Sequence, residues 1–352
     1  MRSPVRQQRR LFLGTSLGLL LSACGGGAED ETSSAREDPS ARARTDAEAL
    51  DAAPAKRRRR ARAYARRGVT AIVAAPDGSS VGVAYSDGRV RLLDATGSGE
   101  RQALKRRGGT AIAGLVFSAD GRYLVAVGRD SVAIGWNVET GERRFSLQGH
   151  EHGLRAIAAS ADGSVIATAG DETRVMLWDG GSGKLKRILG GHTDFVNAVA
   201  VSGNGGLVAS GDADARVLVW QLLTGKLLHT LRGHADEVTA VAFSSDGATV
   251  VSAGEDGKVI LWDMGTGRQL QALAGHKAPV RSLAYNQDGT LLAGGSVDGS
   301  VVVWDMVTRT VSRETSASAS AVNVVMFDRR GEGKVFVGDE LDGVLAWKLP
   351  AR

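Results

Sequence analysis

Histidine, serine and aspartate recur along this 352-residue chain, and together they are the residue types of a nucleophilic hydrolase site. Four of the six histidines follow a glycine at steps of 42 residues: His150, His192, His234 and His276. A catalytic triad could be composed in several places, and His150 and His152 have the spacing of a possible metal-binding pair. The regular step argues against both, because a set that repeats belongs to a repeated scaffold. We therefore expect no catalytic residue, no metal site and no cofactor.

Tryptophan follows the same period. Trp136, Trp178, Trp220, Trp262 and Trp304 are 42 residues apart, Trp347 follows at 43, and Leu93 precedes at 43. An acidic residue lies six positions before the first six members of this series: Asp87, Asp130, Glu172, Asp214, Asp256 and Asp298. Self-similarity at a fixed step of this length is typical of repeat architectures. The series predicts seven repeated units.

Each period contains four short strands. In one of them, apolar stretches at 238–243, 249–253, 259–262 and 269–273 are separated by Gly-containing turns. This pattern predicts four antiparallel strands joined by hairpins. One such sheet has two faces to cover, and seven sheets in a ring cover one another. The sequence predicts an all-β, seven-bladed propeller of four-stranded antiparallel blades.

The pattern resembles the WD-repeat propeller family, whose repeats open on Gly-His and close on Trp-Asp, and the resemblance covers residues 56–352. It implies a buried hydrogen-bonded structural set of histidine, acid, hydroxyl and tryptophan in the blades. Three blades match in full or with a longer acid: His234, Asp256, Ser252 and Trp262; His192, Asp214, Ser210 and Trp220; His150, Glu172, Thr168 and Trp178. A fourth has His276, Asp298 and Trp304, with Gly294 in place of the hydroxyl.

The resemblance also implies a binding rim at the upper mouth of the central channel. In family members that hold peptides, the second residue of the inner strand lines this mouth, joined by the residue before the structural acid. The candidate partner-binding residues are Arg129, Arg155, Asp171, Phe195, Asn197, Thr239, Glu255, Arg281 and Asn323. Arginine can bind a carboxylate or phosphate through two parallel hydrogen bonds, and Phe195 is a candidate apolar anchor. The alternative interpretation is that these are ordinary solvent-exposed loop residues that bind no partner.

Residues 1–23 read as a lipoprotein signal peptide, because four arginines precede a short apolar stretch at 11–21 that ends in small residues. The tetrad at 21–24, LSAC, resembles a bacterial lipobox, which implies a covalent lipid on Cys24, the only cysteine. Arg9-Arg10 fits twin-arginine export and general secretion equally. With Gly25 after the cysteine, the resemblance implies an envelope protein at the outer membrane, facing the periplasm. Residues 24–55 predict a flexible tether.

Only five residues follow Trp347, too few for a loop and a fourth strand. Aligned on the repeat, the arginine-rich segment 56–64 falls at the missing position, so we predict that it forms the closing strand of the last blade. Residues 56–67 carry eight positive charges. The chain's net charge of +5 falls to +1 without the leader and to about −7 without this segment as well. We therefore expect no nucleic-acid partner. The arginines could protect a sheet edge or meet an anionic surface.

Two hypotheses for function remain. The first is a non-enzymatic, lipid-anchored and monomeric scaffold of the cell envelope that docks a protein or peptide on the propeller face. The alternative is an envelope small-ligand or glycan-binding propeller, or a hydrolase, that uses the central channel. A hydrolase would need acids converging on the channel, and the rim supplies only Asp171 and Glu255, two blades apart.

Overall fold

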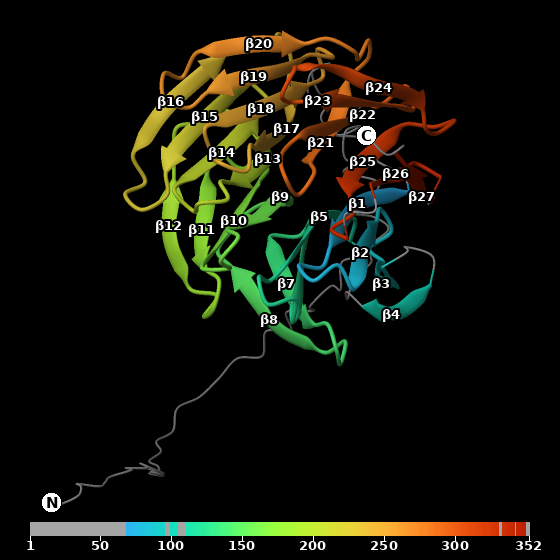
Figure 1. Cartoon of the computed structure of the whole chain (residues 1–352). Coiled ribbons are helices and arrows are strands. Elements are labelled where there is room, and N and C mark those ends of the chain that lie inside the picture. The colour runs from blue at the N-terminus through green and yellow to red at the C-terminus, as the bar shows by residue number, and fades with distance from the viewer. Residues whose placement is uncertain (1–67, 96–98, 105–109, 331–332, 342, 350–352) are drawn as a thin grey trace, which may run out of the picture. The chain divides into compact units, whose positions relative to one another are not determined.

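The computed structural model describes residues 68–95, 99–104, 110–330, 333–341 and 343–349. These residues form seven antiparallel sheets whose first strands contact one another in sequence, with β1 also contacting β25 (Figure 1). The seven-bladed all-β propeller is therefore confirmed. The predicted signal peptide, the tether and the closing strand 56–64 lie outside the described residues. No helix in the described part of the chain is long and apolar enough to cross a membrane.

Each complete blade has four strands that pair in chain order. Blade 1 comprises β1 (Val69–Ala74), β2 (Ser80–Tyr85), β3 (Val90–Asp94) and β4 (Glu100–Leu104). Blade 2 comprises β5 (Ile112–Phe117), β6 (Tyr123–Gly128), β7 (Val132–Asn137) and β8 (Arg143–Gln148). Blade 3 comprises β9 (Leu154–Ala159), β10 (Val165–Gly170), β11 (Val175–Asp179) and β12 (Leu185–Leu189). Blade 4 comprises β13 (Val196–Val201), β14 (Leu207–Asp212), β15 (Arg216–Gln221) and β16 (Leu227–Arg232).

The remaining blades repeat this order. Blade 5 comprises β17 (Val238–Phe243), β18 (Thr249–Gly254), β19 (Val259–Asp263) and β20 (Gln269–Leu273). Blade 6 comprises β21 (Val280–Tyr285), β22 (Leu291–Ser296), β23 (Ser300–Asp305) and β24 (Thr310–Ser316). Blade 7 comprises β25 (Val322–Phe327), β26 (Lys334–Asp339) and β27 (Val344–Lys348), so its sheet has three strands within the described residues.

The core lies between blades, where the apolar faces of neighbouring sheets meet. In blade 5, for example, β18 and β19 are buried along almost their whole length, whereas in β20 only Leu273 is buried. Five of the six tryptophans are at most 2% exposed, and each lies in the third strand of its blade. Apolar burial of this extent is the main driving force for the fold. It explains why the tryptophan period marks the blades.

A bulge occurs at the same place in every inner strand. The pairing between the first and second strands skips the second residue of the first strand: Thr70, Ala113, Arg155, Asn197, Thr239, Arg281 and Asn323. A β-bulge leaves one residue out of the ladder and re-aims its side chain. The seven equivalent positions are thereby directed away from the sheets.

The ring closes between blades 7 and 1 through polar contacts. Asn323 Nδ2 donates to the Val69 carbonyl at 2.9 Å, and Arg330 Nε donates to the Gly78 carbonyl at 3.0 Å. Gly68 enters β1 at φ +77°, where an added Cβ would lie 2.3 Å from the Asp339 carbonyl oxygen. Only glycine fits this approach of the chain to the last blade.

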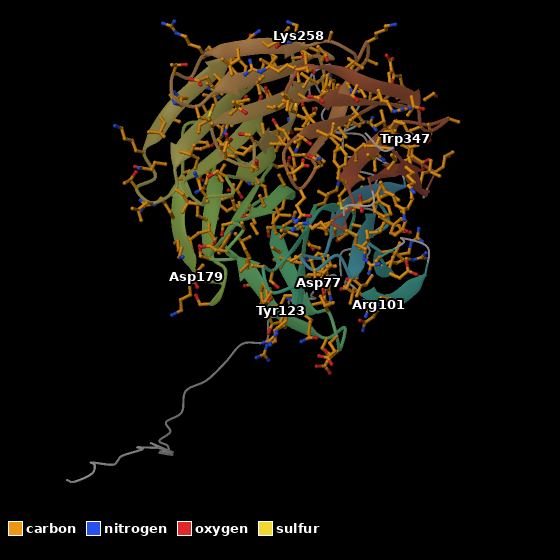
Figure 2. All side chains as sticks on the ribbon, in the orientation of Figure 1. Asp77, Arg101, Tyr123, Asp179, Lys258 and Trp347 are labelled. Carbon is orange, nitrogen blue, oxygen red and sulfur yellow. The ribbon has the colours of Figure 1, made fainter. Side chains whose placement is uncertain are left out.

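The outer part of blade 7 differs from the other blades. Strand β27 is the third strand of its blade, yet Leu345 is 42% exposed, whereas the equivalent strand β19 is buried apart from its last residue. Figure 2 shows Trp347 of β27 at the periphery of the ring. Within the described residues, β27 is therefore an edge strand with exposed apolar side chains.

Candidate functional site

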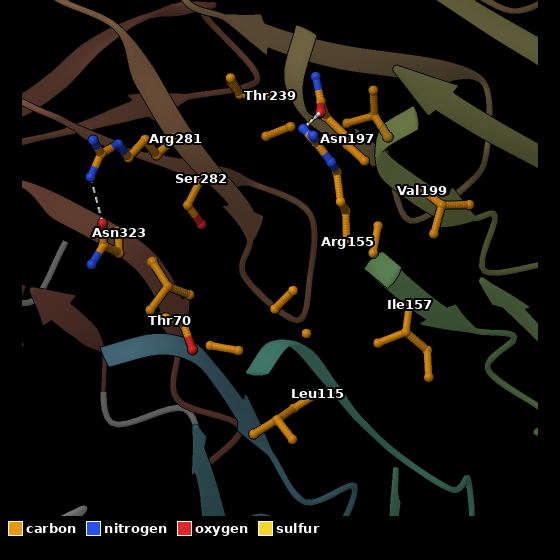
Figure 3. A pocket seen from close by; sticks show the side chains of 18 of the residues that line it. Thr70, Leu115, Arg155, Ile157, Asn197, Val199, Thr239, Arg281, Ser282 and Asn323 are labelled. Carbon is orange, nitrogen blue, oxygen red and sulfur yellow. Dashed lines mark hydrogen bonds between the residues drawn. The ribbon is translucent and has the colours of Figure 1, made fainter. Parts of the chain in front are cut away.

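The upper mouth of the channel is one cavity of about 270 Å³, and all seven bulged residues line it. Seven of the nine predicted rim residues are in its lining: Arg129, Arg155, Asn197, Thr239, Glu255, Arg281 and Asn323. The other two, Asp171 and Phe195, are not in the lining, and both contact Arg155. Figure 3 shows Arg155 and Arg281 on opposite sides of the cavity, each joined to an asparagine of the next blade. The repeat thus brings equivalent side chains from all blades to one place.

Arg155 is held by three neighbours. Its Nε donates to Asp171 Oδ1 at 2.6 Å, and its Nη1 donates to Asn197 Oδ1. Its guanidinium carbon lies 5.0 Å from the centre of the Phe195 ring, within cation–π distance. Phe195 is half-buried and its ring contacts this arginine, and its role as an apolar anchor stays a prediction. The side chain of Arg155 is only 8% exposed, so its position is fixed before any partner arrives.

Arg281 is held in the same manner from the other side. Its Nη1 donates to Asn323 Oδ1 at 2.6 Å and to Glu340 Oε1 at 2.9 Å. Its side chain is 18% exposed. Both arginines therefore line one cavity, and each is already engaged by side chains of the protein: Arg155 through Nε and Nη1, and Arg281 through Nη1. Charge-assisted hydrogen bonds of this kind are among the stronger polar contacts in proteins.

The bulged residues also join neighbouring blades. Asn197 Nδ2 donates to the Val238 carbonyl at 3.2 Å, and the Thr239 hydroxyl donates to the Val280 carbonyl. Arg155 and Arg281 bind asparagines of the next blade, and Asn323 binds blade 1. These hydrogen bonds connect each blade from 3 to 6 with the next one and connect blade 7 with blade 1. In blade 1 the Thr70 hydroxyl is buried without a hydrogen-bond partner, and in blade 2 Ala113 has no polar group.

Two acidic residues of the mouth were not predicted. Glu237 lines the cavity, and its Oε2 accepts from Asn197 Nδ2 at 3.3 Å. Glu340 holds Arg281. Glu340 lies 43 residues after Val297, so it continues the series of residues that precede the structural acid. The sequence does not mark Glu340 as a member of this series, because blade 7 has Leu341 where the other blades have the structural acid.

The charges of the mouth suit recognition of a polar chain. Burial lowers the pKa of Arg129, whose ordinary value is far above neutral pH, so it stays a cation. Among the predicted acids, Asp171 is bound to Arg155 while Glu255 lines the cavity. The structure thus does not bring these two acids together as a catalytic pair. Within the described residues, no group of three or more His, Cys, Asp or Glu side chains could hold a metal ion.

The structural set of blade 5 has a defined proton arrangement. His234 Nδ1 lies 3.0 Å from Asp256 Oδ1, His234 Nε2 lies 2.8 Å from Ser252 Oγ, and Trp262 Nε1 donates to the same hydroxyl at 2.8 Å. Because the hydroxyl accepts from the indole, it donates to Nε2, and Nδ1 carries the ring proton toward the carboxylate. Burial lowers the pKa of His234, although Asp256 opposes this shift. The imidazole is therefore neutral, and its role is structural.

Blade 4 differs from its predicted set. His192 Nδ1 lies 2.7 Å from Asp212 Oδ2, so the predicted partner Asp214 is wrong. Asp214 instead accepts from the Thr193 hydroxyl at 2.5 Å. Arg216 explains the exchange, because its Nε and Nη2 donate to Asp212 at 3.0 and 2.7 Å. The other members are as expected: His192 Nε2 lies 2.5 Å from Ser210 Oγ, and Trp220 is buried.

Blade 3 keeps its set with a changed acid contact. His150 Nε2 lies 2.7 Å from Thr168 Oγ1, to which Trp178 Nε1 also donates at 2.7 Å. Glu172 Oε1 is 3.4 Å from His150 Nδ1, while it accepts the Glu151 amide at 2.6 Å. The additional methylene of glutamate carries the carboxylate past the ring to the backbone of the loop.

Blade 6 departs further. His276 Nδ1 lies 3.3 Å from Ser300 Oγ, and Asp298 accepts the Ser300 amide at 2.9 Å, so the implied direct contact of Asp298 with the ring is replaced by one through Ser300. Trp304 Nε1 donates to the Ala274 carbonyl at 2.6 Å, because Gly294 offers no hydroxyl. His276 Nε2 is buried without a hydrogen-bond partner.

The comparisons with known proteins agree with this architecture. The family model described as WD domain, G-beta repeat, matches residues 141–179, 183–221, 225–263 and 267–305. Each match runs from the outer strand of one blade to the third strand of the next. The comparison with curated proteins finds no match. The four WD40 repeats and the seven-bladed ring together support the chain's membership of the WD-repeat propeller family.

Proposed function

We propose that this chain is a non-enzymatic interaction platform that binds a protein or peptide at the upper mouth of the propeller. WD40 propellers are commonly protein-interaction scaffolds, and they typically bind protein partners. One observation carries the assignment to the upper mouth: seven equivalent bulged residues, one from each blade, line a single cavity. The binding surface is therefore built from the whole ring and does not depend on one loop.

The partner chemistry follows from the two fixed arginines. Arg155 and Arg281 both line the cavity, and their hydrogen bonds to Asn197 and Asn323 hold them there. A preorganised side chain loses little conformational entropy on binding. A partner segment that carries a carboxylate is the best match, with its main-chain groups meeting the asparagine and threonine side chains of the rim. Nucleic acid is not expected, because the positive charge is local in the sequence.

The experiment is a crosslinking pull-down from intact cells, followed by mass spectrometry. Wild type is compared with a triple variant, Arg155→Ala, Phe195→Ala and Arg281→Ala, and with a control that changes Arg143 and Arg144 on β8 to alanine. We expect a protein partner that is lost in the triple variant and kept in the control, with circular dichroism showing both variants folded. A partner retained by the triple variant contradicts docking at this mouth.

We also propose that a lipid on Cys24 anchors the monomeric platform in a bacterial envelope, at the outer membrane facing the periplasm. Three sequence features support this: the arginine-rich and apolar leader, the LSAC tetrad, and the position of the chain's only cysteine within it. Several acyl chains would hold the protein stably, since each buried methylene contributes about 0.8 kcal/mol. The Cys24→Ser variant should move to the soluble envelope fraction. Retention in the membrane fraction would contradict the anchor.

A small ligand or glycan is the competing occupant, because the residues of the mouth line one cavity of about 270 Å³. This volume lies just below the range of small-molecule sites, which span roughly 300–1,000 Å³, so only a small compound would fit. The pull-down separates the two proposals. The small-ligand proposal would be favoured by two results together. No protein partner is captured, and a compound from a glycan or small-molecule panel raises the melting temperature of the wild type but not of Arg281→Ala.

A further inference from the structure

Large apolar side chains are exposed on one sector of the propeller's outer side. Ten large hydrophobic residues of the described chain are exposed, and two of them, Leu341 and Leu345, belong to blade 7. The other eight lie in the outer strands of blades 3–6 and in the turns before them: Leu185, Ile188, Leu223, Leu227, Leu228, Leu270, Val307 and Val311. We call residues 179–189, 221–232, 263–273 and 305–316 the outer rim. The described residues of blades 1 and 2 contribute none.

The two most exposed of these residues occupy equivalent turn positions. Leu223 is 81% exposed and Val307 is 77% exposed, and each is the third residue after the tryptophan of its blade. Tight turns favour Gly, Asn, Asp and Ser, and blades 3 and 5 have Gly181 and Gly265 at this position. A leucine and a valine at two turn tips are therefore not explained by the turn itself.

The outer rim is also basic. Its four segments hold eight Lys and Arg residues against four Asp and Glu residues. The equivalent segments of blades 1 and 2, residues 94–104 and 137–148, hold three against four. Three of the cations, Lys184, Lys226 and Arg268, take the same position, six residues after the tryptophan. The outer rim therefore combines an excess of basic residues with apolar turn tips at Leu223 in blade 4 and Val307 in blade 6, whereas the equivalent segments of blades 1 and 2 have no excess of basic residues.

Hydrogen bonds make the outer rim one continuous surface. Each outer strand is joined to the turn of the next blade: Arg187 Nη2 donates to the Leu223 carbonyl at 3.1 Å, His229 Nε2 lies 2.9 Å from the Met264 carbonyl oxygen, and Gln271 Nε2 donates to the Arg309 carbonyl at 3.2 Å. The apolar tips and the cations are therefore held in fixed relation to each other over four blades.

The turns of the outer rim lie at the end of the propeller opposite the upper mouth. Strand β17 runs from Thr239 at the upper mouth to Phe243, which lines a second cavity of about 350 Å³. Strand β18 returns, and β19 again runs in the direction of β17, so the turn after β19 lies at the lower end. The same alternation holds in the other blades.

We propose that the outer rim contacts the surface of a bilayer that contains anionic phospholipid. Leu223 and Val307 enter the boundary between headgroups and acyl chains, and the flanking Lys and Arg side chains meet the lipid phosphates. Shallow apolar insertion combined with basic residues is the physical basis of peripheral membrane binding. This inference rests on the proposed envelope anchoring and adds an orientation to that proposal. The lower end of the propeller faces the membrane, and the upper mouth stays open to a partner.

A single environment-sensitive fluorophore tests this contact. The chain's only cysteine is removed by Cys24→Ser, and one new cysteine for the label is introduced by Leu223→Cys, Val307→Cys or, as control, Leu341→Cys. Leu341 is 72% exposed and lies in blade 7, outside the outer rim. The full chains are mixed with vesicles of phosphatidylethanolamine and phosphatidylglycerol. We expect a blue shift, and quenching by a lipid-bound quencher, at positions 223 and 307 but not at 341.

Charge variants complete the test. Changing Lys184, Lys226 and Arg268 to glutamine should lower the partition coefficient by roughly tenfold or more, since each cation near the surface contributes about 1 kcal/mol. Changing Arg101, Arg143 and Arg144 to glutamine should lower it less. Equal quenching at all three labels, or none, overturns the proposal. A blue shift at 223 that depends on protein concentration without vesicles would assign the outer rim to a second copy of the chain. Because these chains lack the acylated cysteine, failure here leaves the fractionation result of Cys24→Ser standing separately.

Discussion

Asp212, and not Asp214, holds the imidazole of His192: its Oδ2 lies 2.7 Å from Nδ1 of the ring, and neither side chain is exposed. Burial on its own raises the pKa of Asp212, but hydrogen bonds from His192 and Arg216 outweigh this and hold the pKa below its usual value. The carboxylate is thus charged inside the protein. Blade 4 has exchanged the usual acid of its repeat for one two residues earlier.

The two aspartates should differ strongly when they are changed to asparagine. We expect Asp212→Asn to lower the free energy of unfolding by about 3 kcal/mol or more, because Arg216 loses its buried charged partner. Asp214→Asn should change it by about 0.5 kcal/mol or less, as is usual for a surface position. Urea unfolding of both variants at neutral pH measures this. A larger loss for Asp214→Asn would contradict the assignment.

The Ser252 hydroxyl has two partners, so its removal should cost more than one hydrogen bond. Ser252→Ala leaves both His234 Nε2 and Trp262 Nε1 unpaired in the interior. Each buried polar group that loses its partner costs about 1–3 kcal/mol. We expect a clear fall in the denaturation midpoint, measured against Ser245→Ala in the turn that precedes β18. Equal midpoints for the two variants would show that the set contributes little.

Blade 6 should not accept the hydroxyl that it lacks. A Cβ added at Gly294 would lie 2.8 Å from His276 Nε2 and 2.9 Å from the Trp304 ring, because the rings have closed on the glycine. Gly294→Ser should therefore destabilise the protein, although it restores the sequence pattern. Thermal unfolding of this variant beside wild type measures the effect. An increase in melting temperature would mean that the rings move apart readily.

Stability should fall as the pH drops below about 6.5. Burial lowers the pKa of His150, His234 and His276 from the ordinary value of 6.5, so the unfolded chain takes up protons more readily than the folded one. The three rings therefore make stability decrease with falling pH from that value downward through their folded-state pKa values, while burial raises the pKa of Asp171 to about 7 and so acts in the opposite direction with a single group. Melting temperatures between pH 7.5 and 5.5 measure the slope. The slope should be shallower in His234→Gln and unchanged in His229→Gln; a flat profile in wild type contradicts the neutral buried rings.

The period of the sequence was enough to predict the blades, and the family resemblance predicted most of the residues that line the mouth. The tryptophans recur at a fixed step because those of blades 2 to 6 are each buried in the third strand of their blade. The second residue of each inner strand lines the mouth because a bulge recurs there in all blades. Residues that break the period could not be found in this way. Asp212 is one, since blades 3 and 5 have Gly170 and Gly254 there, and blade 7 likewise has an acid, Asp339, which accepts from the Ser318 hydroxyl at 2.8 Å.

Side-chain contacts across blades also escaped the sequence. Glu340 was missed because blade 7 lacks the acid that anchors its series, and the contact between Phe195 and Arg155 could not be predicted because the two residues belong to different blades. Such contacts depend on how adjacent sheets are placed, which no local pattern encodes. The exposure of Leu223 was equally hidden, because a leucine in a repeat of apolar strands reads as core.

The exposed strand β27 makes the closing segment testable. If residues 56–64 pair with β27, deleting them should lower the melting temperature substantially, because Leu345 and Trp347 would lose their cover. Deleting nine residues of the predicted tether, 35–43, should leave it unchanged. Differential scanning calorimetry of the two deletions compares them at equal length. Equal effects would contradict closure by this segment.

Docking at the upper mouth is tested most directly by site-specific photo-crosslinking in living cells. A photoreactive phenylalanine derivative replaces Glu255, which lines the upper mouth, or Gln287, which lines the lower cavity. The account predicts a discrete protein adduct from position 255 and none from position 287, and it predicts loss of the adduct when Arg281→Ala is added. An adduct from position 287 alone, or one from position 255 that survives Arg281→Ala, would contradict it.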